Sequence, residues 1–316
     1  MLILYMVTSI GKLEVGTAAR RQRRDAASTV HVGAGELLVR EESDVPQRGQ
    51  SMMDRVLRVL EALKAAGDGL TVSEIARHSL IPTASAHRIV GELVELGFLD
   101  RNADRRVRIG TRLWEIVARS SAVFTLREIA LPYMEDLRSV VDAPTLLSVL
   151  DHNDAINVCT LSPRQASATN VTKPGVRLPV LASSPGIILV AFAPPSAQQD
   201  ILATARITRF TEHTVVDRRE LARITSDARR LGYVIVRGWM SADSTGVAVP
   251  VLAEDGSALA ALSVTIPFED ATPSRLLPAL RTTSRGISRA FRVGGSQVDP
   301  RIATLMQRIR QATELV

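Results

Sequence analysis

Polar and basic side chains suited to contacting nucleic acid are concentrated between residues 83 and 108. One group begins an amphipathic segment and consists of Thr83, Ser85, His87 and Arg88. A second group surrounds a short turn and consists of Arg101, Arg105, Arg106 and Arg108. Hydroxyl and guanidinium groups bind phosphate oxygens, and arginine also reads guanine in the major groove. These residues predict a DNA-contacting surface, with a solvated hairpin in a protein-binding domain as the alternative.

The segments that position these side chains have the pattern of three helices followed by a β-hairpin. Apolar residues recur at helical spacing from Val56 to Leu63, and Thr71 with Glu74 matches a capping box that begins a second helix. A third helix after Pro82 ends at Gly97, beyond which the hydrophobic period changes to two. This order predicts a winged helix-turn-helix domain over residues 51–110, whose third helix enters the major groove.

Outside residues 51–110, the sequence suggests a leader, a linker, a larger second domain and a tail. We interpret residues 1–50 as a poorly ordered leader, with a basic DNA-contacting arm or a start codon placed too far upstream as alternatives. Residues 111–131 predict a linker helix, and residues 293–316 predict a tail with a short amphipathic helix. The linker carries a possible dimer seam at Leu113, Trp114, Ile116 and Val117. Because a single winged helix buries little surface on DNA, we expect a homodimer or homotetramer.

Residues 132–292 alternate short β-like runs with helical segments, which predicts an α+β domain with a central, largely antiparallel sheet. The expected strands are 146–151, 155–161, 233–238, 246–252 and 258–266. The expected helices are 183–192, 196–205, 218–230 and 273–291. Pro132 is expected to kink the chain or to begin a new helix.

Composition limits the class of protein more than it identifies a partner. The 316 residues carry 39 basic and 33 acidic side chains, a net charge of +6, and one cysteine, Cys159. A single cysteine excludes an intramolecular disulfide and a thiolate metal cluster, which favours a reducing cytoplasm. We also expect no cofactor. The apolar start lacks a preceding basic residue and fits a signal peptide poorly, and no run is long enough for a membrane span.

The sequence resembles the IclR-type transcriptional regulators over most of its length. The similar stretches in the first domain are SMMDRVLRVLEAL, GLTVSEIARHSLIPTASAHRIVGELVELGFL and VRIG. Those in the second are APTLLSVLD, RLPVLASSPGIILVAF, EHTVVD, GYVIVRG and GVAVPVLAEDGSALAALSVTIP. The resemblance implies a GAF- or profilin-like effector-binding domain whose small-molecule ligand modulates the affinity of the first domain for operator DNA.

The resemblance also implies which residues bind the effector. Carried over by position, they are Ala182, Ser183, Ser184, Gly186, Trp239, Met240, Asp243, Ser244 and Gly246. Two positions depart from the family pattern, because Ile187 replaces a common lysine and Gly246 replaces a common cysteine. These departures favour a more apolar effector over a simple carboxylate. Packing in the core or in a dimer interface is the alternative role for Trp239 and Met240.

Two other functions fit parts of the sequence. A winged-helix protein that binds DNA without sensing a ligand would need only the first domain. An enzyme could use Ser183 or Ser184 as a nucleophile, but the chain lacks the G-x-S-x-G turn around them. The five histidines are scattered, and none has metal-ligand spacing to another. We therefore expect no catalytic activity and no metal.

Overall fold

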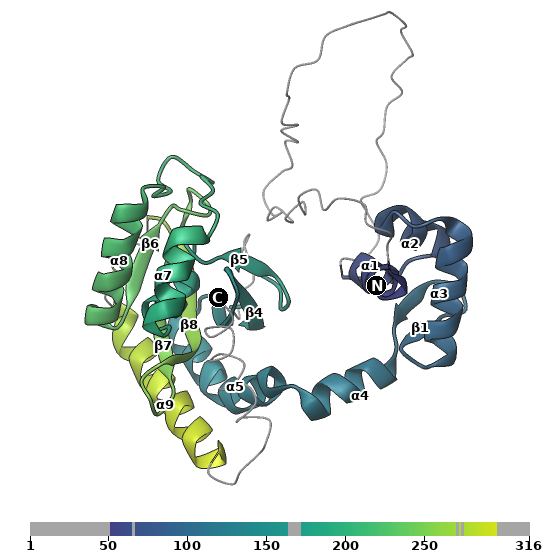
Figure 1. The fold of residues 1–316 in the computed structure, drawn as a ribbon. Coiled ribbons are helices and arrows are strands. Elements are labelled where there is room, and N and C mark those ends of the chain that lie inside the picture. The colour runs from purple at the N-terminus through teal and green to yellow at the C-terminus, as the bar shows by residue number, and fades with distance from the viewer. Residues whose placement is uncertain (1–50, 65–66, 164–171, 270–271, 273–274, 296–316) are drawn as a thin grey trace, which may run out of the picture. The chain divides into compact units, whose positions relative to one another are not determined.

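The computed structural model describes residues 51–64, 67–163, 172–269, 272 and 275–295. The predicted leader at 1–50 and residues 296–316 of the predicted tail lie outside these residues. Within them, the chain forms a helical unit with a two-stranded sheet and a second unit built on a six-stranded sheet (Figure 1).

The first unit is the predicted winged helix-turn-helix domain. It consists of α1 (Met52–Ala62), α2 (Val72–Ser79), α3 (Thr83–Glu95), β1 (Leu99–Arg101) and β2 (Val107–Ile109). The capping box predicted at Thr71 is confirmed, since its hydroxyl accepts from the Glu74 amide at 3.3 Å and the Glu74 carboxylate accepts from the Thr71 amide at 2.8 Å. The buried core of this domain includes Val59, Ile75, Ile89, Leu99 and Val107.

The segment after the hairpin differs from the single linker helix predicted over residues 111–131. Two helices, α4 (Thr111–Ser120) and α5 (Ala122–Val141), meet at Ser121, which has an extended backbone and accepts a hydrogen bond from the Phe124 amide at 3.4 Å. The prediction that Pro132 begins a helix is wrong, because it lies inside α5. Local N-capping by Ser121, rather than proline, sets the boundary.

The second unit contains a six-stranded sheet in the order β5-β4-β3-β8-β7-β6. All of its paired neighbours are antiparallel, as predicted. The strands are β3 (Thr145–Asp151), β4 (Asp154–Leu161), β5 (Arg177–Pro179), β6 (Val234–Arg237), β7 (Ser244–Leu252) and β8 (Ala258–Pro267). The edge strand β5 was not predicted. Asp151 and Asp154 hold it, accepting from Arg177 at 2.6 and 3.3 Å.

These contacts also shift the pKa values of Asp151 and Arg177. Burial alone would raise the pKa of Asp151, but the hydrogen bond and positive charge of Arg177 outweigh that effect and lower it. The pKa of Arg177 is raised in turn by the two carboxylates, against the effect of its own burial. The turn between β3 and β4 and the edge strand are thus joined by a pair that stays charged.

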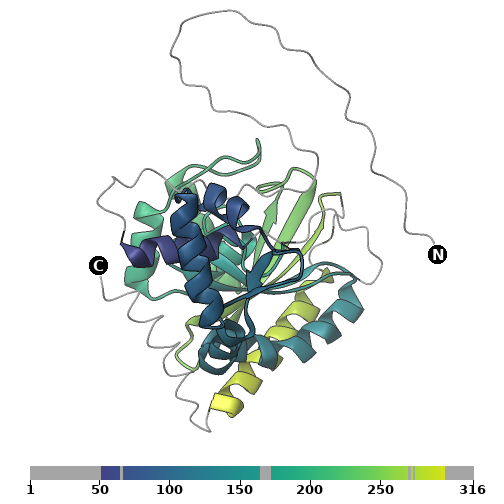
Figure 2. The ribbon, with the colours of Figure 1, turned by 90° about the vertical axis from the view of Figure 1, so that its right-hand side faces the viewer.

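Helices cover both faces of the six-stranded sheet. α5 and α9 (Leu277–Gly295) lie side by side on one face, as both ribbon views show (Figures 1 and 2). The opposite face is covered by α6 (Ser184–Ala191), on which α7 (Pro195–Thr204) and α8 (Arg218–Leu231) pack. Every residue of α6 is buried, whereas α8 exposes most of its charged residues.

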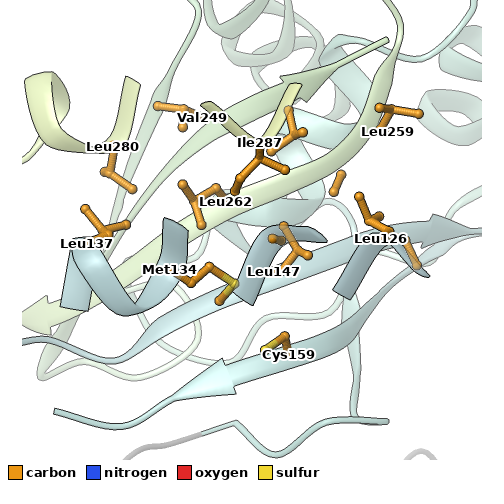
Figure 3. Close-up of a cluster of buried hydrophobic side chains, with 14 of the residues drawn as sticks. Leu126, Met134, Leu137, Leu147, Cys159, Val249, Leu259, Leu262, Leu280 and Ile287 are labelled. Carbon is orange, nitrogen blue, oxygen red and sulfur yellow. The ribbon is translucent and has the colours of Figure 1, made fainter. Parts of the chain in front are cut away.

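The two faces of the sheet carry side chains of different size. Toward α5 and α9 the strands present large apolar residues, such as Leu147, Val249 and Leu262, which meet Leu126, Met134, Leu137, Leu280 and Ile287 (Figure 3). Alternation along the strands directs the intervening residues toward α6. Many of these are small or polar, namely Ser148, Asn157, Gly246, Ala248, Ala261 and Ser263, and Leu146, Val234 and Val236 share this face with them. Buried apolar side chains pack on both faces: the cluster under α5 and α9 on one, and Ile187, Ile188 and Leu189 of α6 on the other.

Candidate DNA-binding surface and effector site

The residues predicted to read DNA lie on the solvent side of α3. A left-handed residue, Leu80 with φ of 53°, ends α2, and the amide of the buried Ile81 donates to the Ala76 carbonyl at 3.1 Å, which fixes the turn into α3. The buried side of α3 carries Ala86, Ile89, Val90 and Leu93. On the other side, Thr83, His87 and Arg88 are exposed and Ser85 is half-buried. Arg88 bonds to Glu92 on the same helix at 3.0 Å, an exposed pair that DNA can displace.

The four arginines of the hairpin are not equivalent. Arg101 and Arg105 are exposed, and Arg105 lies at the tip of the turn with φ of 59°. Arg106 is half-buried and donates to the Gly69 carbonyl at 2.6 Å, with Glu74 at 3.7 Å. Arg108 is exposed, and its Nε lies 3.4 Å from the Asp68 carbonyl. Arg106 is therefore engaged in hydrogen bonding within the domain. Arg101 and Arg105 are the arginines best placed to contact DNA.

Glu74 links the start of α2 to the hairpin. Its pKa is lowered chiefly by the hydrogen bond from the Thr71 amide, then by that from the Thr71 hydroxyl, with a smaller contribution from the charge of Arg106. The capping carboxylate thus stays ionised beside Arg106, which holds the hairpin against α2.

Four carried-over effector residues lie at or just before the start of α6, and all of them are buried: Ala182, Ser183, Ser184 and Gly186. Ser183 caps the helix: its hydroxyl donates to the Pro179 carbonyl at 2.8 Å and accepts from the Gly186 amide at 3.3 Å. At Gly186 a Cβ atom would lie 2.3 Å from the Val180 carbonyl oxygen, so only glycine fits. These two residues hold the turn that leads into α6.

Gly246 on β7 meets α6 from the sheet side. A Cβ atom at this position would lie 2.5 Å from the Ser184 Oγ, so the missing side chain lets Ser184 approach the strand. The structure thus brings Ser184 and Gly246 together, as the resemblance implied, although they are 62 positions apart in sequence numbering (246 − 184).

The loop before β7 is tied to the 210–214 turn. The Thr214 hydroxyl donates to the Trp239 carbonyl at 2.7 Å, and Thr211 donates to the Gly238 carbonyl. Trp239 is buried and Met240 and Ser244 are half-buried, but Asp243 is exposed and its carboxylate accepts from Ser241. Asp243 therefore lies apart from the other carried-over effector residues, which are buried or half-buried.

Two buried polar residues on the face of the sheet that α6 covers were missed by sequence reasoning. Ser148 on β3 and Asn157 on β4 are both fully buried. The Ser148 Oγ and the Asn157 Oδ1 have no hydrogen-bond partner among the described residues. Each is a polar residue inside an otherwise apolar strand, LLSVL or AINVC, and that interruption is the signal that could have revealed them.

The described residues contain no group of three His, Cys, Asp or Glu side chains that could hold a metal ion. Burial raises the pKa of the Cys159 thiol, so this side chain is neutral in the core. Among the helices of the described residues, none has both the length and the apolar character needed to cross a membrane.

A winged helix-turn-helix unit joined to an α+β domain with polar groups buried under α6 defines a two-domain transcription regulator with a DNA-binding and an effector-binding part. Family comparison agrees: residues 53–103 match the IclR helix-turn-helix domain, and residues 119–289 match the domain described as "Bacterial transcriptional regulator IclR C-terminal". The chain belongs to the IclR family.

Individual relatives are transcription regulators as well. The chain is 26% identical over 256 residues to the HTH-type transcriptional repressor AllR of Klebsiella pneumoniae, covering 78% of this chain and 91% of that protein. It is 24% identical to the Pca regulon regulatory protein of Pseudomonas putida, covering 74% and 81%. A solved IclR homolog from Microbacterium hydrocarbonoxydans, complexed with 4-hydroxybenzoate, is 39% identical, covers 77% of this chain and 100% of that chain, and has a TM-score of 0.71.

Proposed function

We propose that α3 and the β1–β2 hairpin bind operator DNA and that a small aromatic compound, bound between α6 and the sheet, changes this affinity. The exposed side of α3 offers Thr83, Ser85, His87 and Arg88 to base edges and phosphates. The hairpin offers Arg101, Arg105 and Arg108 to the DNA backbone. Arg106 supports the hairpin from within.

The observation that carries the effector proposal is the 39% identity to a regulator solved with 4-hydroxybenzoate. The chain's own residues support a compound of this type. α6 is uncharged and entirely buried, and the face of the sheet beneath it is lined by small residues such as Gly246, Ala248 and Ala261. An apolar ring with few polar substituents suits these surroundings better than an aliphatic dicarboxylate.

The test is whether effector and DNA binding are coupled. Operator fragments are first identified by sequencing the DNA that co-purifies with the protein, and affinity is then measured by fluorescence anisotropy. We expect 4-hydroxybenzoate or benzoate to change operator affinity by about 5- to 150-fold, the usual range of allosteric coupling. Succinate serves as the control ligand. Operator binding that no aromatic acid alters would favour the alternative, a DNA-binding protein without ligand sensing.

We also propose that the protein is a homodimer joined through α4. Trp114, Ile116 and Val117 are 59%, 47% and 46% exposed, a large apolar area for one ten-residue helix, whereas Leu113 is half-buried. Sedimentation at micromolar concentration should show a dimer or tetramer. Trp114→Lys with Val117→Lys should shift the protein toward monomers and weaken operator binding, because two half-sites are then no longer engaged together.

Val140→Lys is the matched control, since Val140 is 72% exposed on α5, outside the proposed seam. The seam would lie elsewhere if the α4 double variant kept the oligomeric state of the wild type.

A further inference from the structure

Ser148 and Asn157 lie opposite each other on neighbouring strands, on the face of the sheet that α6 covers. They are Cα partners in the antiparallel pairing of β3 with β4. Leu147 and Val149, on either side of Ser148, belong to the core under α5 and α9, so Ser148 points the other way. Residues directly opposite in a ladder share a face, with Cβ atoms roughly 4.5–5.5 Å apart. One small polar group can therefore reach both side chains.

The hydrogen bonds of Asn157 fix the direction of its amide group. The Thr160 hydroxyl donates its proton to the Thr172 carbonyl at 2.5 Å, so its oxygen is left as an acceptor. The Asn157 Nδ2 donates to that hydroxyl at 2.5 Å and to the Thr172 carbonyl at 3.0 Å. Two acceptors hold the nitrogen on this side, and the Oδ1 must point away from it. This oxygen is a fixed acceptor that finds no donor among the described residues.

The Ser148 hydroxyl is also unpaired. Its Oγ is fully buried and has no partner in the described parts of the chain. On the β8 side of Ser148 its ladder partner is Ala261, which has no polar side-chain atom. Buried polar groups in native proteins are nearly always hydrogen-bonded, and leaving two neighbouring ones unpaired destabilises the folded state. Such a pair is expected where a ligand supplies the missing bonds.

We infer that Ser148 and Asn157 bind a hydroxyl group of the effector. A phenolic hydroxyl has one proton and lone pairs, so it donates to the fixed Asn157 Oδ1 and accepts from the Ser148 hydroxyl. The pair therefore selects aromatic compounds that carry a ring hydroxyl over the same compounds without it. This inference rests on the proposed function, because it assigns the polar end of the ligand in the same effector site.

Calorimetric titration with 4-hydroxybenzoate and benzoate tests the inference on the full-length protein. A site built to bond a hydroxyl rejects the analogue that lacks it, because its polar groups then stay unpaired. We expect the wild type to bind 4-hydroxybenzoate at least about tenfold more tightly than benzoate, since one net hydrogen bond corresponds to roughly a tenfold change in affinity. Ser148→Ala should lower this preference by about tenfold, mainly through weaker binding of 4-hydroxybenzoate.

Thr245→Val is the matched control. Thr245 is also fully buried with an Oγ1 that lacks a partner among the described residues, but alternation with Val247 places it on the α5 and α9 face. This variant should keep the ligand preference of the wild type. Without ligand, Ser148→Ala should unfold at the same temperature as the wild type or higher, because it loses only an unpaired hydroxyl. A purely structural serine would instead lower that temperature.

The outcomes separate the two proposals. If the wild type binds neither compound, the proposed aromatic effector is overturned and this inference with it. If it binds both compounds equally, or if Ser148→Ala keeps the full preference for 4-hydroxybenzoate, the effector site stands and the hydroxyl-binding role is overturned. A lower unfolding temperature of ligand-free Ser148→Ala would likewise overturn that role.

Discussion

Reversing the charge of both exposed arginines, as Arg101→Glu with Arg105→Glu, should remove most of the hairpin's contribution to DNA affinity. Both side chains are exposed and form no ion pair within the described residues, so the change acts on the bound state rather than on folding. Each lost phosphate contact should reduce the slope of log affinity against log salt by about 0.9. Binding to operator and to random DNA should weaken alike, because backbone contacts carry no sequence information.

Fluorescence anisotropy over a range of salt concentrations measures both quantities. Arg285→Glu with Arg289→Glu is the matched control, since these residues are exposed on α9 in the second domain and the change in charge is the same. Arg106 is left out of the variant because its guanidinium group supports the hairpin through Gly69. A slope equal to that of the wild type would remove the hairpin from the DNA-contacting surface.

Gly186→Ala should lower the free energy of unfolding of the second domain by about 3 kcal/mol, near the upper end of overpacking effects. The added methyl group would lie 2.3 Å from the carbonyl oxygen and 2.4 Å from the Cα atom of Val180. Both are backbone atoms, which a side-chain rotation cannot move away. The start of α6 must shift, so effector binding should weaken as well.

Gly91→Ala is the matched control for this substitution. Gly91 also lies within a helix, α3, and a Cβ atom there would meet nothing within 4 Å. Alanine should stabilise this helix by roughly 0.5–1 kcal/mol, because glycine is the poorer helix former. Differential scanning calorimetry of both variants gives the comparison. Equal unfolding temperatures for Gly186→Ala and the wild type would show that the turn before α6 adapts freely.

Elements with a strong local pattern were predictable from the sequence. The capping box at Thr71 and the alternating strands of the second domain are specified by residues within a few positions of each other. The edge strand β5 was missed because its three residues, ending in Pro179, have no period of their own. Its strand character depends on pairing with β4 and on the bonds of Arg177. The break at Ser121 was missed because the apolar spacing continues across it.

The site could be predicted only in part for a similar reason. The resemblance grouped Ser184, Gly246 and Asp243 as effector residues; the structure brings Ser184 and Gly246 close together and leaves Asp243 exposed. Arg106 looked equivalent to Arg105 because its bond to Gly69 joins residues 37 positions apart. Ser148 and Asn157 could not be recognised as a pair from the sequence, because only the pairing of β3 with β4 places their two unsatisfied polar atoms on one face of the sheet.

The unlike faces of the six-stranded sheet bear on how such a regulator acquires a new signal. Leu147, Val249 and Leu262 face α5 and α9, whereas the small residues Ala248, Ala261 and Ser263 lie under α6. Substitutions at these three buried positions change the surface offered to a small molecule, but every added methyl group also strains the packing under α6. Divergence of effector specificity therefore trades against stability, and a biosensor library would begin at the same three positions with small changes in side-chain volume.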